Sequence, residues 1–197
     1  MTLNLESANE LIRGVLGKDY LELKVNKVII DDDTQGKCKV YLYINGSELT
    51  GDGIGFVDAM FDAIKKHYAK KYESLTTIQL NDFKIVLTGK KSNHTVSKTE
   101  GTDAFCVAYL TLKNHYGTSF NFQASSCSLA TAAARSIAGG SEYFINAERA
   151  YVALQRALED AKGRNRQDLV RRYTLGLSEV VKSTSYTQVL NKIPRES

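Results

Sequence analysis

Residues 51–72 read GDGIGFVDAMFDAIKKHYAKKY, a glycine-rich stretch that runs directly into an amphipathic pattern. Because glycine has no Cβ atom, residues 51–55 favour a tight loop between a strand and a helix. The apolar residues that follow recur at the spacing of one helix face, which predicts a helix from Phe56 onward that covers a core. That face comprises Phe56, Met60, Ala63, Ile64 and His67.

Alternating segments precede this loop. Residues 21–30 (LELKVNKVII) and 37–44 (KCKVYLYI) alternate apolar with polar side chains and are rich in β-branched and aromatic residues, as half-buried strands are. The dipeptide Asn45-Gly46 favours a hairpin turn into a third short strand. Residues 20–72 therefore predict a βββα unit, which is three strands followed by one helix.

A second set of strands follows downstream. Residues 78–87 alternate apolar with polar side chains, and 104–112 (AFCVAYLTL) form an apolar strand. After a turn at Tyr116-Gly117, residues 118–123 (TSFNFQ) alternate again. These segments predict the three strands of a second unit.

A serine-rich stretch opens the helix of this second unit. Ser125 to Ser128 favour the cap of a helix over 129–138, and Gly139-Gly140 is expected to end that helix. The same serines have no GxSxG context and no histidine placed in sequence as a base, so a cap is favoured over a nucleophile.

Matching spacing indicates an internal repeat. Gly46 and Asp58 are 12 residues apart, and Gly117 and Ser128 are 11 residues apart. A repeat of this size predicts an α+β fold of two tandem βββα units related by a pseudo-twofold axis. The two units span 20–72 and 78–138.

Helical patterns flank the two units. Ser7 and Glu10 have the spacing of a capping box at the start of a helix that Gly17 ends. Two amphipathic helices follow the units, over 141–162 and 166–184. The predicted organisation is a helical lead-in over 1–19, a domain of two units over 20–138, and a helical extension over 139–197.

Length and charge narrow the function. With 197 residues the chain is too short for a (β/α)₈ enzyme barrel, which needs about 250 residues. The formal net charge of +4 resides entirely in residues 160–197, so the core offers no basic surface for nucleic acid. The basic run from Lys162 to Arg172 has no interleaved aromatic residues, and a solvated helix face is favoured over contact with an acidic partner.

Targeting signals and disulfide patterns are missing from the sequence. No apolar stretch reaches 18 residues, and the first residues lack a basic region followed by an apolar one. Cys38, Cys106 and Cys127 are odd in number and widely spaced, unlike a disulfide framework or a zinc site. We expect a cytoplasmic protein that does not contact a membrane.

Motifs for a metal or a cofactor are also missing. His67, His94 and His115 have no partner at metal-ligand spacing, and no GxGxxG or GK[ST] motif occurs. Asp31 to Asp33 lack EF-hand spacing and favour a solvated loop over a cation site. We expect no metal and no cofactor, and an enzyme acting through this chain alone is the least favoured function.

The stretch Gly53-Ile54-Gly55-Phe56-Val57-Asp58-Ala59 resembles the GxGxVDA loop-to-helix motif of a known family, although Phe56 stands where the family usually has proline. The family is the C-terminal regulatory (allosteric and dimerisation) domain of 2-isopropylmalate synthase and citramalate synthase. Gly101-Thr102-Asp103-Ala104 is similar to its GxDA motif before the second long strand. The resemblance covers about residues 20–138, but residues 123–128 lack the family's second GxG motif and acidic helix start.

The resemblance implies a homodimer that binds a branched-chain amino acid, leucine or isoleucine, as an effector in branched-chain amino acid biosynthesis. The residues that it implies for effector binding are Gly53, Gly55, Val57, Asp58, Ala59, Asp103 and Ala104. The loop over 53–55 is the candidate donor of N–H groups to the effector carboxylate, with a plain tight turn as the alternative.

The resemblance also implies a catalytic barrel that this chain does not contain. The barrel of the family is a synthase, an acyltransferase, and it supplies the metal ligands, so a catalytic domain or subunit is an expected partner. The alternative is a stand-alone dimeric scaffold with a decayed effector site, in which the helices after residue 140 dock a partner.

Overall fold

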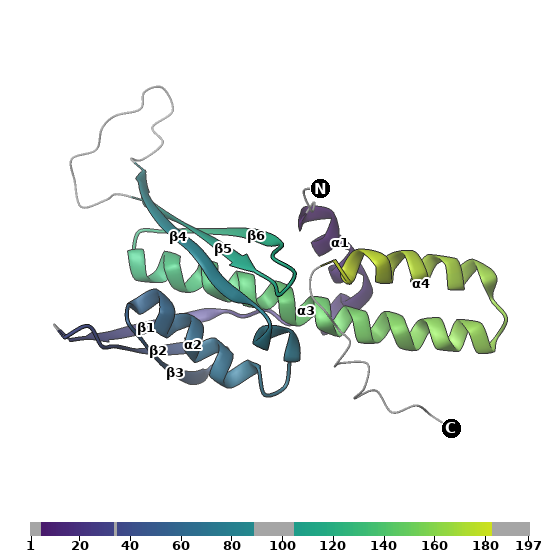
Figure 1. Ribbon diagram of the computed structural model, residues 1–197, viewed down its shortest axis with the longest axis horizontal. Helices are drawn as coiled ribbons and strands as arrows, with labels where there is room; N and C mark the ends of the chain where they lie inside the picture. Colours follow the sequence, from purple (N-terminus) through teal and green to yellow (C-terminus); the bar gives the residue numbers. More distant parts are fainter. Residues whose placement is uncertain (1–4, 34, 89–104, 183–197) are drawn as a thin grey trace.

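The computed structural model describes residues 5–33, 35–88 and 105–182, and every structural statement below concerns these residues (Figure 1). Their strands form two three-stranded antiparallel sheets, in the orders β1-β2-β3 and β4-β5-β6. The first sheet consists of β1 (Val25–Asp32), β2 (Cys38–Ile44) and β3 (Ser47–Gly53). The second consists of β4 (Gln79–Thr88), β5 (Phe105–Lys113) and β6 (Ser119–Ser126).

Helices cover one face of each sheet. They are α1 (Leu5–Leu16), α2 (Phe56–Tyr68), α3 (Leu129–Gly163) and α4 (Gln167–Val180), with short 3-10 turns η1 (Gly17–Asp19) and η2 (Glu73–Thr76). α2 follows β3 and packs on β2 and β3, whereas α3 follows β6 and packs on β5 and β6. The predicted α+β fold of two βββα units followed by C-terminal helices is confirmed.

The predicted alternation of side chains is present in the central strands. On β2, Val40, Leu42 and Ile44 are each 0% exposed. Tyr41 and Tyr43 lie between them on the opposite face of the strand. Burying one such aliphatic side chain is worth about 1.5–3 kcal/mol, so the helix-covered faces supply most of the stabilisation.

Each repeat helix also contacts the sheet of the other unit. α3 packs against β1 as well as against its own strands. On α2, Phe56 meets Phe83 of β4 edge to face, with ring centroids 6.5 Å apart. A single core cluster therefore contains residues of both units, which stabilise each other.

Polar side chains in the middle of α3 hold the segment that leads into β1. Asn146 is 0% exposed; its Oδ1 accepts from the Leu21 N–H at 2.9 Å and its Nδ2 donates to the Leu21 carbonyl at 2.8 Å. Glu142 accepts from the Tyr20 hydroxyl and from the Leu23 N–H, both at 2.9 Å. Burial and the nearby Glu142 carboxylate raise the pKa of Tyr20 further above neutral pH.

The helix of the second unit continues through Gly139-Gly140, so the predicted helix end is wrong. Neither glycine has the positive φ of a helix-ending residue. A Cβ atom at Gly140 would lie 2.8 Å from Leu112 Cδ1 and 3.1 Å from Phe122 Cδ2, so this glycine lets α3 approach the sheet closely. The predicted boundary between 20–138 and 139–197 falls inside α3, and the division into domains stays a prediction.

Three local expectations also differ from the structure. α1 already contains Leu5, so Ser7 lies inside the helix instead of capping its start. Residues 51–53 extend β3, which leaves only Ile54 and Gly55 as the loop before α2. His67 is exposed, because the buried face of α2 turns toward Phe61.

The two adjacent glycines of α3 give a matched test of the continuous helix. Gly139 has open space around its Cβ position, so Gly139→Ala should raise the free energy of unfolding by about 0.5–1 kcal/mol through helix propensity. Gly140→Ala should be less stable than Gly139→Ala by about 1–2 kcal/mol, because its Cβ atom crowds the core. Urea denaturation measures both values, and equal effects at the two positions would contradict this packing.

Candidate functional site

The N-terminus of α2 is the candidate site. Gly55 is the N-cap residue, with φ −138° and ψ 168°, and no described side chain caps the helix there. The first intrahelical bond runs from the Ala59 N–H to the Gly55 carbonyl at 3.0 Å. The N–H groups of Phe56, Val57 and Asp58 precede that bond and have no partner within the helix, so they are available to an anion.

The glycines before this helix have two different roles. A Cβ atom at Gly51 would overlap the Ala59 carbonyl oxygen, and one at Gly53 would lie 2.5 Å from the Ala59 nitrogen. Both glycines therefore allow the first turns of α2 to lie directly on β3. A Cβ atom at Gly55 would meet nothing within 4 Å, so this glycine is not needed for packing. Gly55 instead affects the end of the helix, because a glycine at the N-cap leaves α2 without a capping side chain.

An ion cluster fixes the register of α2 on β3. Asp62 of α2 accepts from the Asp52 N–H at 2.9 Å. Lys66 Nζ lies 2.7 Å from Asp62 Oδ2 and 3.0 Å from Asp52 Oδ2. Hydrogen bonds to Asp62 and Asp52 raise the pKa of Lys66, so the lysine stays charged over the physiological range.

The structure brings five of the seven predicted site residues together, in one stretch from the end of β3 through the first turn of α2: Gly53, Gly55, Val57, Asp58 and Ala59. They do not face the same way. Ala59 is 0% exposed against β3, and Val57 packs partly into the core. Asp58 is exposed at the first helical turn. The accessible part of the stretch is therefore Gly55, the Asp58 carboxylate and the free N–H groups.

The other two predicted residues, Asp103 and Ala104, lie outside the described residues. The residue that follows them, Phe105, begins β5 and is 42% exposed.

Two residues near the site were missed by sequence reasoning. Ile54 is 86% exposed, the highest value among the large apolar side chains of the described residues. Its position between two glycines in a short loop, where nothing could cover it, was the available signal. The sequence predicts Gly51 as part of a loop, and only the packing of α2 on β3 shows why a glycine is needed there.

The equivalent position in the second unit is different. Gly53 pairs with Cys38 across the first sheet, and Ser126 pairs with Cys106 across the second, so Ser126 corresponds to Gly53. The second strand end has therefore exchanged a glycine for a residue with a side chain. Both repeat helices carry a small residue against their sheet, since Ala132 of α3 is 0% exposed, as is Ala59 at the equivalent position of α2.

The second repeat helix is also capped. Ser128 is the N-cap of α3, and its hydroxyl accepts from the Thr131 N–H at 3.3 Å. The predicted cap is thus confirmed. One of the N–H groups that α2 leaves open is already bonded in α3, so the two units do not offer equivalent sites.

The chain is thus a small α+β protein built from two βββα units, in which the helix of the first unit has an uncapped N-terminus. The sequence matches the LeuA allosteric (dimerisation) domain over residues 3–145, which is more than half of the chain. The chain belongs to this family, whose role is allosteric regulation and dimerisation, and the resemblance seen in the sequence is confirmed. A comparison with curated proteins gives no match.

Two kinds of feature are absent from the described residues. No group of three or more His, Cys, Asp and Glu side chains lies close enough to hold a metal ion. None of the helices in this part of the chain is long and apolar enough to cross a membrane.

The glycines of this site give a second matched pair of variants. Gly51→Ala should lower the free energy of unfolding by about 3 kcal/mol, because its Cβ atom would overlap backbone of α2 that has no room to move. Gly55→Ala should stay within about 0.5 kcal/mol of the parent. Urea denaturation of both proteins tests this assignment, and a large loss at Gly55 would contradict it.

Proposed function

We propose that this chain is the effector-binding part of a homodimeric regulatory protein, and that its effector is a branched-chain amino acid, leucine or isoleucine. The observation that supports this most strongly is the uncapped N-terminus of α2. Membership of an allosteric domain family indicates that a ligand is bound, and the open N–H groups indicate that the ligand carries an anion.

The chemistry of the first turn suits an amino acid. The effector carboxylate accepts from the N–H groups of Phe56, Val57 and Asp58. The exposed Asp58 carboxylate supplies an acceptor for the effector ammonium group. Ile54 supplies an apolar contact for the branched side chain, and its own exposure falls when the ligand or a second subunit covers it.

The regulated activity would belong to another domain or subunit. By family membership that partner is a 2-isopropylmalate or citramalate synthase, an acyltransferase of branched-chain amino acid biosynthesis in the cytoplasm. Effector binding at α2 would then be linked to the catalytic site, and linkage is reciprocal for the two binding free energies.

The capped helix N-terminus of the second unit favours a second function. Ser128 caps α3, and Ser126 stands where the first unit has Gly53. A chain that has lost one of two equivalent sites fits a dimeric scaffold whose effector site has decayed. Both functions predict a homodimer, so ligand binding separates them and oligomeric mass does not.

Calorimetric titration with leucine and with isoleucine tests the proposal. We expect measurable heat with the parent chain and with Gly55→Ala, which leaves the N–H groups open. Gly55→Asp should abolish the heat, because an aspartate at an N-cap accepts from the N–H group two or three residues later and repels a second carboxylate. Asp is a better N-cap than Gly, so this variant should unfold no more easily than the parent.

If the parent chain gives no heat with either amino acid up to millimolar concentration, effector binding is rejected and the dimeric scaffold is the function that remains. Equal heat from Gly55→Asp and the parent would place the ligand elsewhere.

A further inference from the structure

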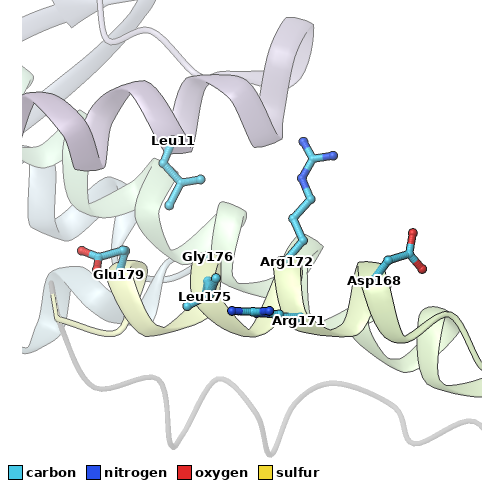
Figure 2. Close-up of a pocket in the computed structure, with 7 residues that line it drawn as sticks. All are labelled: Leu11, Asp168, Arg171, Arg172, Leu175, Gly176 and Glu179. Atoms are coloured by element: carbon cyan, nitrogen blue, oxygen red, sulfur yellow. The ribbon is translucent and has the colours of Figure 1, made fainter.

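α4 runs beside the C-terminal half of α3, beyond the residues that match the family, and also contacts α1 (Figure 1). Its buried face is formed by Gly176, Leu177 and Val180. At the border between this buried face and the exposed face, a hollow of about 470 Å³ opens between α4 and Leu11 of α1, as Figure 2 shows. The α4 residues that line the hollow are Asp168, Arg171, Arg172, Leu175, Gly176 and Glu179.

The centre of this face is apolar and uncovered. Leu175 is 61% exposed although it lies midway along the helix. A leucine that stays in water forgoes most of the free energy that burial would give. The hollow next to it, with Leu11 on its far side, has room for a further apolar side chain.

The charged side chains around Leu175 form only weak ion pairs within the described part of the chain. Asp168 pairs with Arg166 at 2.8 Å and Glu179 pairs with Lys182 at 2.7 Å, and these side chains are all about half exposed. Arg171 has no ion-pair partner among the described residues. Exposed pairs of this kind contribute little and exchange partners at little cost.

The order of these charges is self-complementary about Leu175. Arg171 lies four residues before Leu175 and Glu179 four residues after it. Asp168 lies seven residues before Leu175, and Lys182, two residues beyond the end of α4, lies seven residues after it. When residues 168–182 are reversed about Leu175, each of these four residues finds the opposite charge, whereas Arg172 finds the neutral Ser178.

We propose that a second copy of this chain docks on this face, with the two α4 helices antiparallel and a twofold axis at Leu175. Arg171 pairs with Glu179 of the partner subunit, and Asp168 pairs with Lys182 of the partner subunit, each of them twice. The two Leu175 side chains meet on the axis and enter the hollows beside Leu11. Such a contact is isologous, since the same patch is used on both subunits.

Reversal symmetry is what selects a second copy over another occupant. An acidic helix of a different protein would be attracted by Arg171 and Arg172, but its binding would not need the charges of Asp168 and Lys182. A pair of single helices buries less than the roughly 1,600 Å² of a standard interface, so this contact acts together with a further one. Proximity of the two helices, and not mass, is therefore the proper readout.

Cysteine cross-linking measures that proximity. The exposed Cys127 is first replaced (Cys127→Ser), while the buried Cys38 and Cys106 stay in place. In this background Leu175→Cys should form a disulfide-linked dimer under oxidised glutathione. Thr174→Cys is the matched control, because it is exposed on the adjacent side of the same helix, and it should cross-link several-fold less.

Charge reversal tests the pairing. In the Leu175→Cys background, Arg171→Glu alone and Glu179→Arg alone should each lower the cross-linking yield by about tenfold, since both symmetric pairs become repulsive. The two reversals together restore both pairs and should restore the yield. Arg156→Glu, a reversal at an exposed position on α3, should leave the yield unchanged.

Equal cross-linking at positions 174 and 175 would overturn the proposal. Failure of the double reversal to restore the yield would overturn it as well, and would favour an unlike acidic partner. The result is independent of effector binding, because Arg171→Glu leaves the N-terminus of α2 untouched and its leucine titration should equal that of the parent.

Discussion

Three polar side chains in the middle of α3 hold the chain on both sides of the first unit. Glu142 and Asn146 bind the backbone of the segment before β1. Glu148, 7% exposed, accepts from the Ser74 N–H at 2.8 Å, in the turn between α2 and β4. The bond to Ser74 is buried and the bonds to Leu21 and Leu23 are partly buried, and leaving a buried backbone group without its partner costs about 1–3 kcal/mol.

These anchors explain why α3 cannot stop where its glycines suggest. Asn146 and Glu148 lie about two turns beyond Gly140, so the bonds exist only if the helix continues. A helix that belongs to the second unit thus determines how the first unit enters and leaves its sheet. The two units form one core for this reason, and not as two separate modules.

The shared core gives the two repeat helices different ends. α2 begins at Gly55, and its position on β3 is fixed by Gly51, Gly53 and the Asp62 carboxylate. No side chain among the described residues caps its N-terminus. α3 begins at Ser128, which occupies that position with its own hydroxyl. Two units with the same fold can therefore differ at their helix ends, and of their two helices only α2 has an uncapped N-terminus.

Periodicity was sufficient to predict much of this structure from the sequence. The alternation in residues 37–44 and the turn at Asn45-Gly46 place β2 and β3 correctly, because strand burial and turn geometry are local. The cap at Ser128 is equally local and was predicted. The open end of α2 was not predicted: the sequence indicates the loop over 53–55 as the donor of N–H groups, whereas the structure leaves those of the first turn of α2 without a partner in the helix.

Features that depend on residues far apart in the chain could not be predicted from the sequence. Asn146 contacts Leu21 across 125 positions of the chain, and no spacing rule indicates that pair. Gly140 does not end the helix as the sequence predicts, because the absence of a Cβ atom lets α3 lie close to Leu112, and this packing offsets a helix propensity about 1 kcal/mol lower than that of alanine. The charge order of α4 can be read from the sequence, but only the structure shows that Leu175 and its neighbours are exposed.

The central claim is that an effector carboxylate binds the open N-terminus of α2 and not the capped N-terminus of α3. Backbone amide resonances in a ¹⁵N-labelled chain titrated with leucine test it most directly. We expect the largest shifts at the amides of Val57 and Asp58, with the Thr131 amide unchanged. Saturable shifts elsewhere, with the amides of Val57 and Asp58 unmoved, would contradict this assignment.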